Sequence, residues 1–279
     1  MNTLSKQNAR RAAKIYGADE VREAITTGKL ANYYQSQVDI TTRQVVGVEA
    51  LARWFHPQDG MVYPHQFIGV AEAHGLINDR TRVILANSLA QAKVWQEAGL
   101  MLRVGVNLSS GNLASLEFVD VVVGCATEAG VPPQLVDLEM PTNSLKEDLS
   151  TPREVLTRLR QQQFRLSFND VDIENASLAQ LCDLPFDEIK ITPSVVHGAW
   201  NNVELQAKFD CTTRLAKRLG KSVLAVGVED RADWDFIQRT ECRIAQGFLI
   251  SKPMPGPDLP GWIRSWHSTD KTPTHSSAV

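Results

Sequence analysis

The stretch VVGVEALARW, Val45 to Trp54, is an apolar run that carries a single carboxylate, Glu49, at its centre. It is followed at once by a positively charged and an aromatic residue, Arg53 and Trp54. A carboxylate inside such a run is costly to bury unless a cation or several hydrogen-bond donors contact it. We therefore expect a positively charged group to lie beside Glu49.

The same pattern recurs downstream, where short apolar stretches each end in an ionisable or amide residue. These stretches are VGVNLS, LVDLEM, FRLSFND, DEIKIT, LAVGVED and IAQGF, and helical patterns or loops separate them. The polar residues that follow Glu49 in this series are Asn107, Glu139, Asn169 with Asp170, Lys190, Glu229 and Gln246. Polar groups at the carboxyl ends of successive strands are typical of the functional rim of a (β/α)8 barrel. The sequence therefore predicts an α/β fold of the TIM-barrel type.

The first strand of this barrel is predicted to run against the others. Leu30 to Ile40, LANYYQSQVDI, has the alternation and aromatic content of a strand, and the turn TTRQ leads directly into the Glu49 strand. Two strands joined by so short a turn form an antiparallel hairpin. After Trp54, helical and strand patterns alternate as far as Gln246, which is the βα order of a parallel sheet.

Length and composition favour one large domain without extended nucleic acid as a ligand. A barrel of about 250 residues fits within the chain, and the net charge of −3 leaves no excess of positive charge for many phosphates. The four cysteines form no Cys-x-x-Cys pair, which argues against zinc and against a disulfide framework. We expect a soluble, cytosolic protein with no signal peptide or membrane span. The expected divisions are an N-terminal extension over 1–17, the barrel over 18–262 and a polar, disordered tail over 263–279.

The residue types on the rim favour hydrolysis of a phosphodiester with the help of a metal ion. Glu49, Asn107, Glu139 and Asp170 offer oxygen ligands, which suit Mg²⁺ or Mn²⁺ and argue against zinc or copper. The other candidate residues are Lys190 to orient a water or balance a phosphate, Glu229 as a base or a partner of Lys190, and Arg53 to bind phosphate oxygens. Lys190 could instead form an ion pair in the barrel core with Glu139 or Glu229.

Glu49-Ala50-Leu51, followed by Arg53-Trp54, resembles the signature of the EAL-domain phosphodiesterases of bacterial cyclic di-GMP signalling. The stretches VNLS, DEIKI, GVE and AQGFLISKPMP are similar to later strand ends of that family, and the resemblance covers roughly residues 18–255. It implies a modified barrel with an antiparallel first strand and cyclic di-GMP as the ligand. The implied metal ligands are Glu49, Asn107, Glu139 and Asp170, and Lys190, Glu229 and Gln246 would surround the attacking water. By the same resemblance, Gln35 and Leu51 would contact a guanine and Arg53 a phosphate.

The chain departs from the family in the loop after the Asn169 strand. Where the family has Asp-Asp-Phe-Gly-Thr-Gly, this chain has NDVDIE from Asn169 to Glu174. In the family the first aspartate bridges two metal ions, and an asparagine cannot do so because its amide has one oxygen and an NH₂ donor. The same loop contributes to a dimer contact in the family, which leaves a monomer and a homodimer as alternatives.

Three further departures concern residues that support the site, namely Thr142, Thr192 and Val226, where the family has acidic residues. Supporting residues of this kind commonly contribute about 10-fold to 100-fold each to metal affinity or activity. The sequence therefore favours an effector that binds cyclic di-GMP or a partner protein, holds one metal ion or none, and hydrolyses weakly or not at all. The alternatives are an active phosphodiesterase that produces linear pGpG and a nucleotide-independent module that binds a signalling protein.

Overall fold

The computed structural model describes residues 16–141, 149–169 and 184–269. Its strands are β1 (Leu30–Asp39), β2 (Val45–His56), β3 (Gly60–Val62), β4 (Arg103–Asn107), β5 (Val136–Pro141), β6 (Arg165–Asn169), β7 (Glu188–Ile191), β8 (Ser222–Val226), β9 (Ile244–Gln246) and β10 (Met254–Pro255). Its α-helices are α2 (Ala18–Thr26), α3 (Ile68–Ala73), α4 (Ile77–Glu97), α5 (Glu117–Ala129), α6 (Ser150–Gln161), α8 (Pro193–Val196), α9 (Val203–Arg218), α10 (Arg231–Ile237) and α11 (Leu259–Thr269). Short 3-10 helices are η1 (Pro64–Gln66), η2 (Ser110–Ala114), η3 (Pro133–Leu135), η5 (Ala199–Asn201) and η6 (Gly256–Asp258).

The strands form a ten-stranded sheet that closes on itself through the pairing of β1 with β2. Without β3 and β10, which extend its edges, the closed part has eight strands in the order β1, β2, β4, β5, β6, β7, β8, β9. Each pair from β2 to β9 is parallel, whereas β1 is antiparallel to both β2 and β9. The predicted modified TIM barrel with an antiparallel first strand is confirmed.

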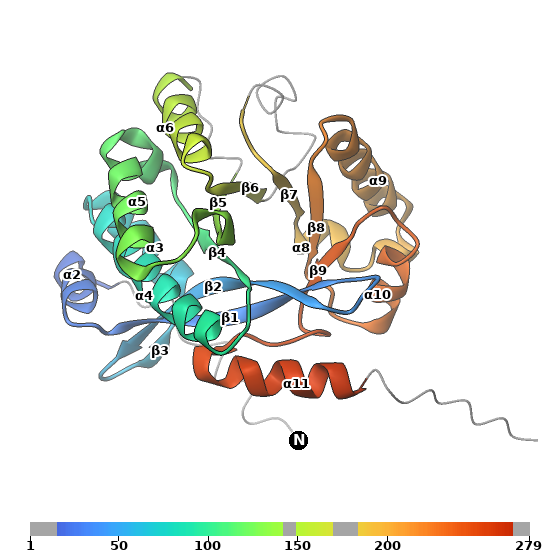
Figure 1. Ribbon diagram of the computed structural model, residues 1–279, viewed down its shortest axis with the longest axis horizontal. Helices are drawn as coiled ribbons and strands as arrows, with labels where there is room; N and C mark the ends of the chain where they lie inside the picture. Colours follow the sequence, from blue (N-terminus) through green and yellow to red (C-terminus); the bar gives the residue numbers. More distant parts are fainter. Residues whose placement is uncertain (1–15, 142–148, 170–183, 270–279) are drawn as a thin grey trace, which may run out of the picture.

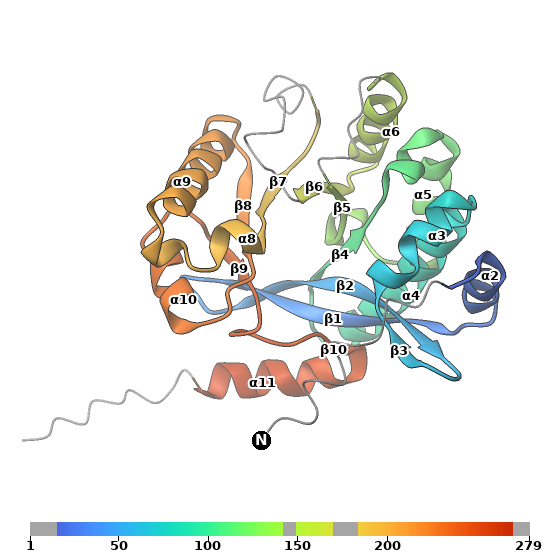
Figure 2. The same ribbon diagram turned by 180° about the vertical axis from the view of Figure 1, so that it is seen from behind.

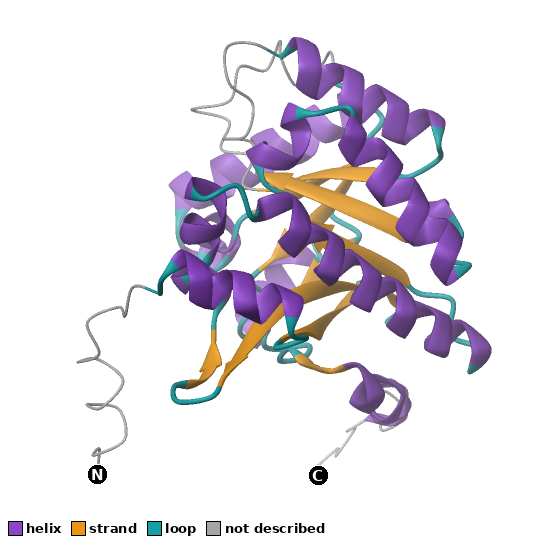
Figure 3. Ribbon diagram, turned by 90° about the vertical axis from the view of Figure 1, so that its left-hand side faces the viewer, coloured by secondary structure: helices purple, strands orange, loops and turns teal. Residues whose placement is uncertain are grey.

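The helices surround the barrel, with α4, α5 and α6 on one side and α9 and α10 on the other (Figures 1 and 2). Seen from the side, the strands occupy the middle of the molecule and the helices form the outer layer (Figure 3). Two layers of side chains are therefore buried, one inside the barrel and one between strands and helices. Large residues of the second layer include Trp54, Trp95 and Trp234, each at most 2% exposed.

Helix α11 lies outside the barrel beside β1 and β10 (Figures 1 and 2). It continues to Thr269, beyond the expected end of the barrel domain at residue 262. Leu259 and Ile263 are buried, and Trp266 Nε1 donates to the carbonyl oxygen of Arg43 in the β1–β2 turn at 2.9 Å. This packing explains why the start of the tail predicted to be disordered is helical. Across the described ranges, none of the helices has the length and apolar content that a membrane span requires.

Candidate functional site

Five of the polar residues predicted at strand ends lie at or near the carboxyl ends of the barrel strands, whereas Glu49 lies within β2. Asn107, Asn169 and Gln246 are the last residues of β4, β6 and β9. Lys190 lies one residue before the end of β7, and Glu139 lies two residues before the end of β5. The parallel register aligns Asn107 with Glu139 and Glu49 with Gly105. Because these strands enclose one barrel, their side chains meet at one end of its interior.

The positively charged group expected beside Glu49 is Lys190. Its Nζ forms an ion pair with Glu139 Oε1 and lies 3.8 Å from Glu49 Oε2. Burial would lower the pKa of Lys190, but the carboxylates of Glu139 and Glu49 outweigh burial and raise that pKa above its ordinary value. Burial raises the pKa of Glu139, against the opposing effect of Lys190. The buried ammonium group of Lys190 therefore lies between two carboxylates. Its ion pair with Glu139 is one that the alternative of an ion pair in the barrel core predicted.

Amide groups bind the remaining oxygens of these carboxylates. Asn107 Nδ2 donates to Glu49 Oε1 at 2.6 Å, and Gln246 Nε2 donates to Glu49 Oε2 at 2.6 Å. Asn169 Nδ2 donates to Asn107 Oδ1 at 3.0 Å and to Glu139 Oε2 at 3.3 Å. The side chain of Asn169 thus turns its NH₂ donor, and not its oxygen, toward the other residues of the site.

Two glutamines of β1, Gln35 and Gln37, extend this network through hydrogen bonds with Gln246. Gln246 Nε2 also donates to Gln35 Oε1 at 3.1 Å, and Gln35 Nε2 donates to the carbonyl oxygen of Ser251 at 2.9 Å. Gln37 Nε2 donates to Gln246 Oε1 at 3.0 Å. Gln37 is not among the predicted site residues, although its spacing of two from Gln35 on a strand places both on the same face. Gln246 is therefore held from both sides while it donates to Glu49.

A glycine on β4 makes room for the carboxylate of Glu139. A Cβ atom at Gly105 would overlap Glu139 Oε1 and Cδ. Any residue with a side chain at this position would have to displace the carboxylate or the strand. Gly105 is thus part of the site although it has no functional group.

Two cavities adjoin this network. The larger, of about 570 Å³, lies beside β2, α3 and α4, and Glu49, Leu51, Asn107 and Asn169 all contribute to its wall. The smaller, of about 170 Å³, is lined by Glu49, Asn169, Lys190, Ile191, Thr192, Pro193 and Val226. Thr192 and Val226, two of the departures from the family pattern, therefore contribute to the wall next to Lys190.

Arg53 lies near the end of β2 beside two aromatic rings, and its contact with a phosphate stays a prediction. It is 6% exposed, and its guanidinium lies 5.5 Å from the ring centre of Tyr33 and 5.1 Å from that of Tyr63. One amino group donates to the carbonyl oxygen of Ala52 at 2.8 Å, and burial lowers the pKa of Arg53. Among the described residues that line the larger cavity, its neighbours Leu51 and Ala52 are present and Arg53 is not.

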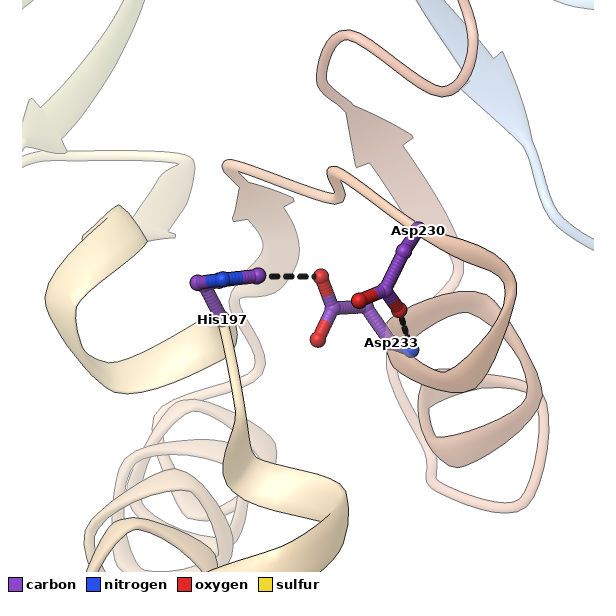
Figure 4. A group of neighbouring side chains, drawn as sticks. All are labelled: His197, Asp230 and Asp233. Carbon is purple, nitrogen blue, oxygen red and sulfur yellow. Dashed lines mark hydrogen bonds and ion pairs between the residues drawn. The ribbon is translucent and has the colours of Figure 1, made fainter.

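Glu229 lies just after β8 on a loop that a buried aspartate holds in place. Asp233 Oδ2 accepts hydrogen bonds from the backbone N–H of Glu229 at 3.0 Å and from His197 Nδ1 at 2.8 Å, and Asp233 Oδ1 accepts from the backbone N–H of Gly198 at 2.9 Å. Figure 4 shows His197, Asp233 and Asp230, whose ligand atoms lie within 4.8 Å of one another. Because Asp230 caps α10 by accepting from the backbone N–H of Asp233 at 2.9 Å, these carboxylates already have structural partners. We interpret the group as a brace between the segments that follow β7 and β8.

Among the described residues, the oxygen donors Glu49, Asn107 and Glu139 form a set suited to a hard divalent cation. Asp170 lies outside the described residues. The NH₂ of Asn169 donates to Asn107 Oδ1 and Glu139 Oε2, so Asn169 presents a donor and not an oxygen ligand to these two residues. The described donors therefore suit a divalent metal ion such as Mg²⁺ or Mn²⁺.

Comparison with known proteins agrees with this architecture. A family model described as the EAL domain matches residues 18–253. The chain belongs to the EAL domain family. The resemblance based on Glu49-Ala50-Leu51 is thereby confirmed, and so is the relationship to cyclic di-GMP phosphodiesterases.

Relatives of this EAL domain include an oxygen sensor protein and a cyclic di-GMP phosphodiesterase. It is 29% identical over 95% of its length to the oxygen sensor protein DosP of Escherichia coli, and 30% identical over 83% of its length to the cyclic di-GMP phosphodiesterase PA2567 of Pseudomonas aeruginosa. These matches cover 32% and 39% of the two relatives, so the chain spans about a third of their length. Among solved structures, the MucR phosphodiesterase in complex with cyclic di-GMP has a TM-score of 0.82 and 30% identity, covering 86% of this chain and 98% of that one.

Proposed function

We propose that this EAL domain binds cyclic di-GMP at the mouth of its barrel as an effector and hydrolyses it weakly or not at all. The observation that carries the proposal is the orientation of Asn169. Its NH₂ donates to Asn107 Oδ1 and Glu139 Oε2, whereas a carboxylate at this position could be shared by a pair of metal ions. An amide donor repels a cation and cannot supply one oxygen to each of two ions.

The ligands proposed for a single Mg²⁺ or Mn²⁺ are Glu49, Asn107, Glu139 and Asp170. When bound, such an ion polarises a phosphate oxygen and lowers the pKa of a coordinated water. Lys190 already neutralises much of the negative charge of Glu49 and Glu139. Fewer negative charges remain to hold a second cation, which favours ligand binding over cleavage.

The chain's own residues supply further contacts to the dinucleotide. Leu51 contributes an apolar wall for a base, and the guanidinium of Arg53 has donors that fit phosphate oxygens. Lys190 would balance a phosphate or orient a water, with Gln246 keeping Glu49 in position from the other side. Glu229 is exposed on its braced loop and could accept the proton of that water.

A slow phosphodiesterase is the second candidate. It is favoured by the hydrogen-bonded set of Glu49, Asn107, Glu139 and Gln246 around Lys190, which supplies most of the groups that metal-assisted hydrolysis requires. The 30% identity to the phosphodiesterase PA2567 also supports it. The two candidates differ in whether bound cyclic di-GMP stays intact.

Isothermal titration calorimetry with cyclic di-GMP, with and without Mn²⁺, followed by chromatography of the ligand after a long incubation, tests the proposal. We expect saturable binding and recovery of intact cyclic di-GMP. Leu51→Asp should abolish the heat because it places a charge in the cavity wall, whereas Met101→Asp, at an exposed position before β4, should leave it unchanged. Rapid appearance of linear pGpG would support the phosphodiesterase, and absence of heat would support a nucleotide-independent module.

A further inference from the structure

Arg80 is a charged residue on the buried face of α4. It lies in the first turn of that helix, and the neighbours at helical spacing on the same face, Ile77 and Ile84, are buried in the core. The side chain of Arg80 is itself only 4% exposed. Ile77 and Ile84, three residues before and four residues after Arg80, indicate in the sequence that Arg80 lies on the buried face of the helix. The pattern of polar residues at strand ends does not cover residues in helices.

The guanidinium of Arg80 lacks the partners that a buried cation normally has. Its Nε is buried without a hydrogen-bond acceptor, and within the described parts of the chain no carboxylate forms an ion pair with it. Burial lowers the pKa of Arg80 to about 10, and the carboxylate of Glu72 opposes this effect. The group therefore remains charged at neutral pH, and a buried donor without an acceptor is costly. An acceptor supplied by a ligand would remove that cost.

The cavity next to Arg80 connects this guanidinium to the proposed site. Arg80 lines the same space of about 570 Å³ as Glu49, Asn107 and Asn169. The volume falls within the range of about 300–1,000 Å³ that small-molecule pockets occupy. Apolar side chains cover much of the wall around Arg80, and they are Leu51, Ala52, Pro64, Ile68, Ile84 and Leu108.

The walls and charges of this cavity fit a purine base better than a phosphate. Apolar side chains can contact both faces of a flat ring, whereas a phosphate would lose its hydration against them. The carboxylate of Glu72 lines the same cavity and would repel a phosphate, but it can accept hydrogen bonds from a base. Arginine donates in a fixed fork that matches the O6 and N7 acceptors of guanine.

We propose that Arg80 is a specificity-determining residue that donates hydrogen bonds to O6 and N7 of a guanine in this cavity and so selects guanine over adenine. Adenine would present its N6 amino group, a donor, to the donors of Arg80. This inference rests on the proposed binding of cyclic di-GMP. It assigns base selection to a side chain on α4, outside the strand ends that carry the predicted metal ligands.

Calorimetric titrations of the unmodified chain, Arg80→Met and Arg82→Met test the assignment with cyclic di-GMP and cyclic di-AMP. Arg82 is the control because it is an exposed arginine on the same helix and does not line this cavity. We expect Arg80→Met to weaken cyclic di-GMP binding by about 10-fold to 100-fold, with a much smaller effect on cyclic di-AMP. Arg82→Met should resemble the unmodified chain.

A cyclic di-GMP analogue with 7-deazaguanine bases tests the same contact without a substitution that could impair folding. It lacks the N7 acceptor, so the unmodified chain should bind it about 10-fold or more weakly than cyclic di-GMP, and Arg80→Met should bind both alike. If the unmodified chain binds cyclic di-GMP while the analogue and Arg80→Met cause no loss, the role of Arg80 is wrong and the proposed function stands. If the unmodified chain binds neither dinucleotide, both proposals are wrong.

Discussion

Lys190 neutralises two carboxylates at the centre of the barrel mouth. It is 3% exposed and contacts Glu139, which is fully buried, while Glu49 lies 3.8 Å away and accepts hydrogen bonds from two amides. Removing one partner of a buried ion pair leaves an uncompensated charge, which costs about 3–5 kcal/mol. Lys190 is therefore expected to stabilise the fold as well as to serve the site.

Urea denaturation of a double-mutant cycle separates these effects. We expect Lys190→Met to lower the free energy of unfolding by about 3–5 kcal/mol, and Lys190→Met with Glu139→Gln to recover much of that loss because the charge without a partner is gone. Lys217→Met is the control, since Lys217 pairs with Glu241 on the surface and should change stability by about 1 kcal/mol or less. Equal effects of Lys190→Met and Lys217→Met would contradict the buried pair.

Asn169 is the residue to which the account attributes weak hydrolysis. We expect Asn169→Asp to increase Mn²⁺-dependent cleavage of cyclic di-GMP by about 10-fold to 100-fold, because a carboxylate can supply an oxygen to each of two cations. Chromatographic quantification of linear pGpG measures the rate. Asn201→Asp makes the same change at an exposed position in η5 that does not line this cavity, and it should leave the rate unchanged. An Asn169→Asp variant no faster than the unmodified chain would remove the reason for calling the site incomplete.

At the scale of single elements, the sequence predicted the strands of the barrel better than the contacts between them. Strand-end polar residues identified Glu49, Asn107, Glu139, Asn169, Lys190 and Gln246, because each strand contributes its own local signal. Gln37 and Arg80 have no such signal. Their roles depend on which residues of β9 and of the large cavity lie opposite them, and that depends on how the barrel closes.

A substitution at Gly105 on β4 tests how closely the neighbouring strands approach each other in the site. We expect Gly105→Ala to destabilise the fold by about 1–3 kcal/mol, as overpacking does, because the added methyl group overlaps the carboxylate of Glu139. Gly124→Ala in α5 is the matched control. Its Cβ would meet no atom within 4 Å, and alanine should stabilise the helix by up to about 1 kcal/mol. Thermal unfolding that moves in the same direction for both variants would contradict this account.

The brace formed by His197 and Asp233 after β7 and β8 predicts that the stability of the fold depends on pH. The hydrogen bond from His197 to Asp233 raises the pKa of His197. Burial would raise the pKa of Asp233, but hydrogen bonds from His197, Gly198 and Glu229 outweigh burial and lower it. The stabilisation by His197 is complete below its unfolded pKa of about 6.5 and is lost as the pH rises through the folded value. The stabilisation by Asp233 is complete above its unfolded pKa of about 3.9 and is lost as the pH falls through its folded pKa.

NMR titration of the His197 ring protons measures this linkage. The unmodified chain should titrate above the ordinary histidine pKa, and Asp233→Asn should return the midpoint toward about 6.5. His74 is the internal control because it is exposed after α3, far in sequence from Asp233. Identical His197 midpoints in the two proteins would show that the ion pair does not form in solution.

For the whole molecule, the antiparallel β1 closes the barrel and α11 packs outside it. The hairpin was predictable because the turn between Leu30–Asp39 and Val45–His56 is short. The helix over Leu259–Thr269 was missed, although Leu259, Trp262, Ile263 and Trp266 have the i, i+3, i+4, i+7 spacing of an amphipathic helix. Leu259 and Ile263 are buried by its packing against the rest of the fold. Residue 170 and the segment after it lie outside the described residues, so the role of Asp170 stays a prediction.

The central claim is that this barrel mouth binds cyclic di-GMP without assembling a pair of bridged cations. Diffraction at the manganese absorption edge, from crystals grown with cyclic di-GMP and Mn²⁺, tests it most directly. We predict anomalous density for at most one ion, near Glu49, Asn107 and Glu139, beside an intact dinucleotide. Two fully occupied manganese ions sharing a ligand at Asn169 or Asp170 would contradict it.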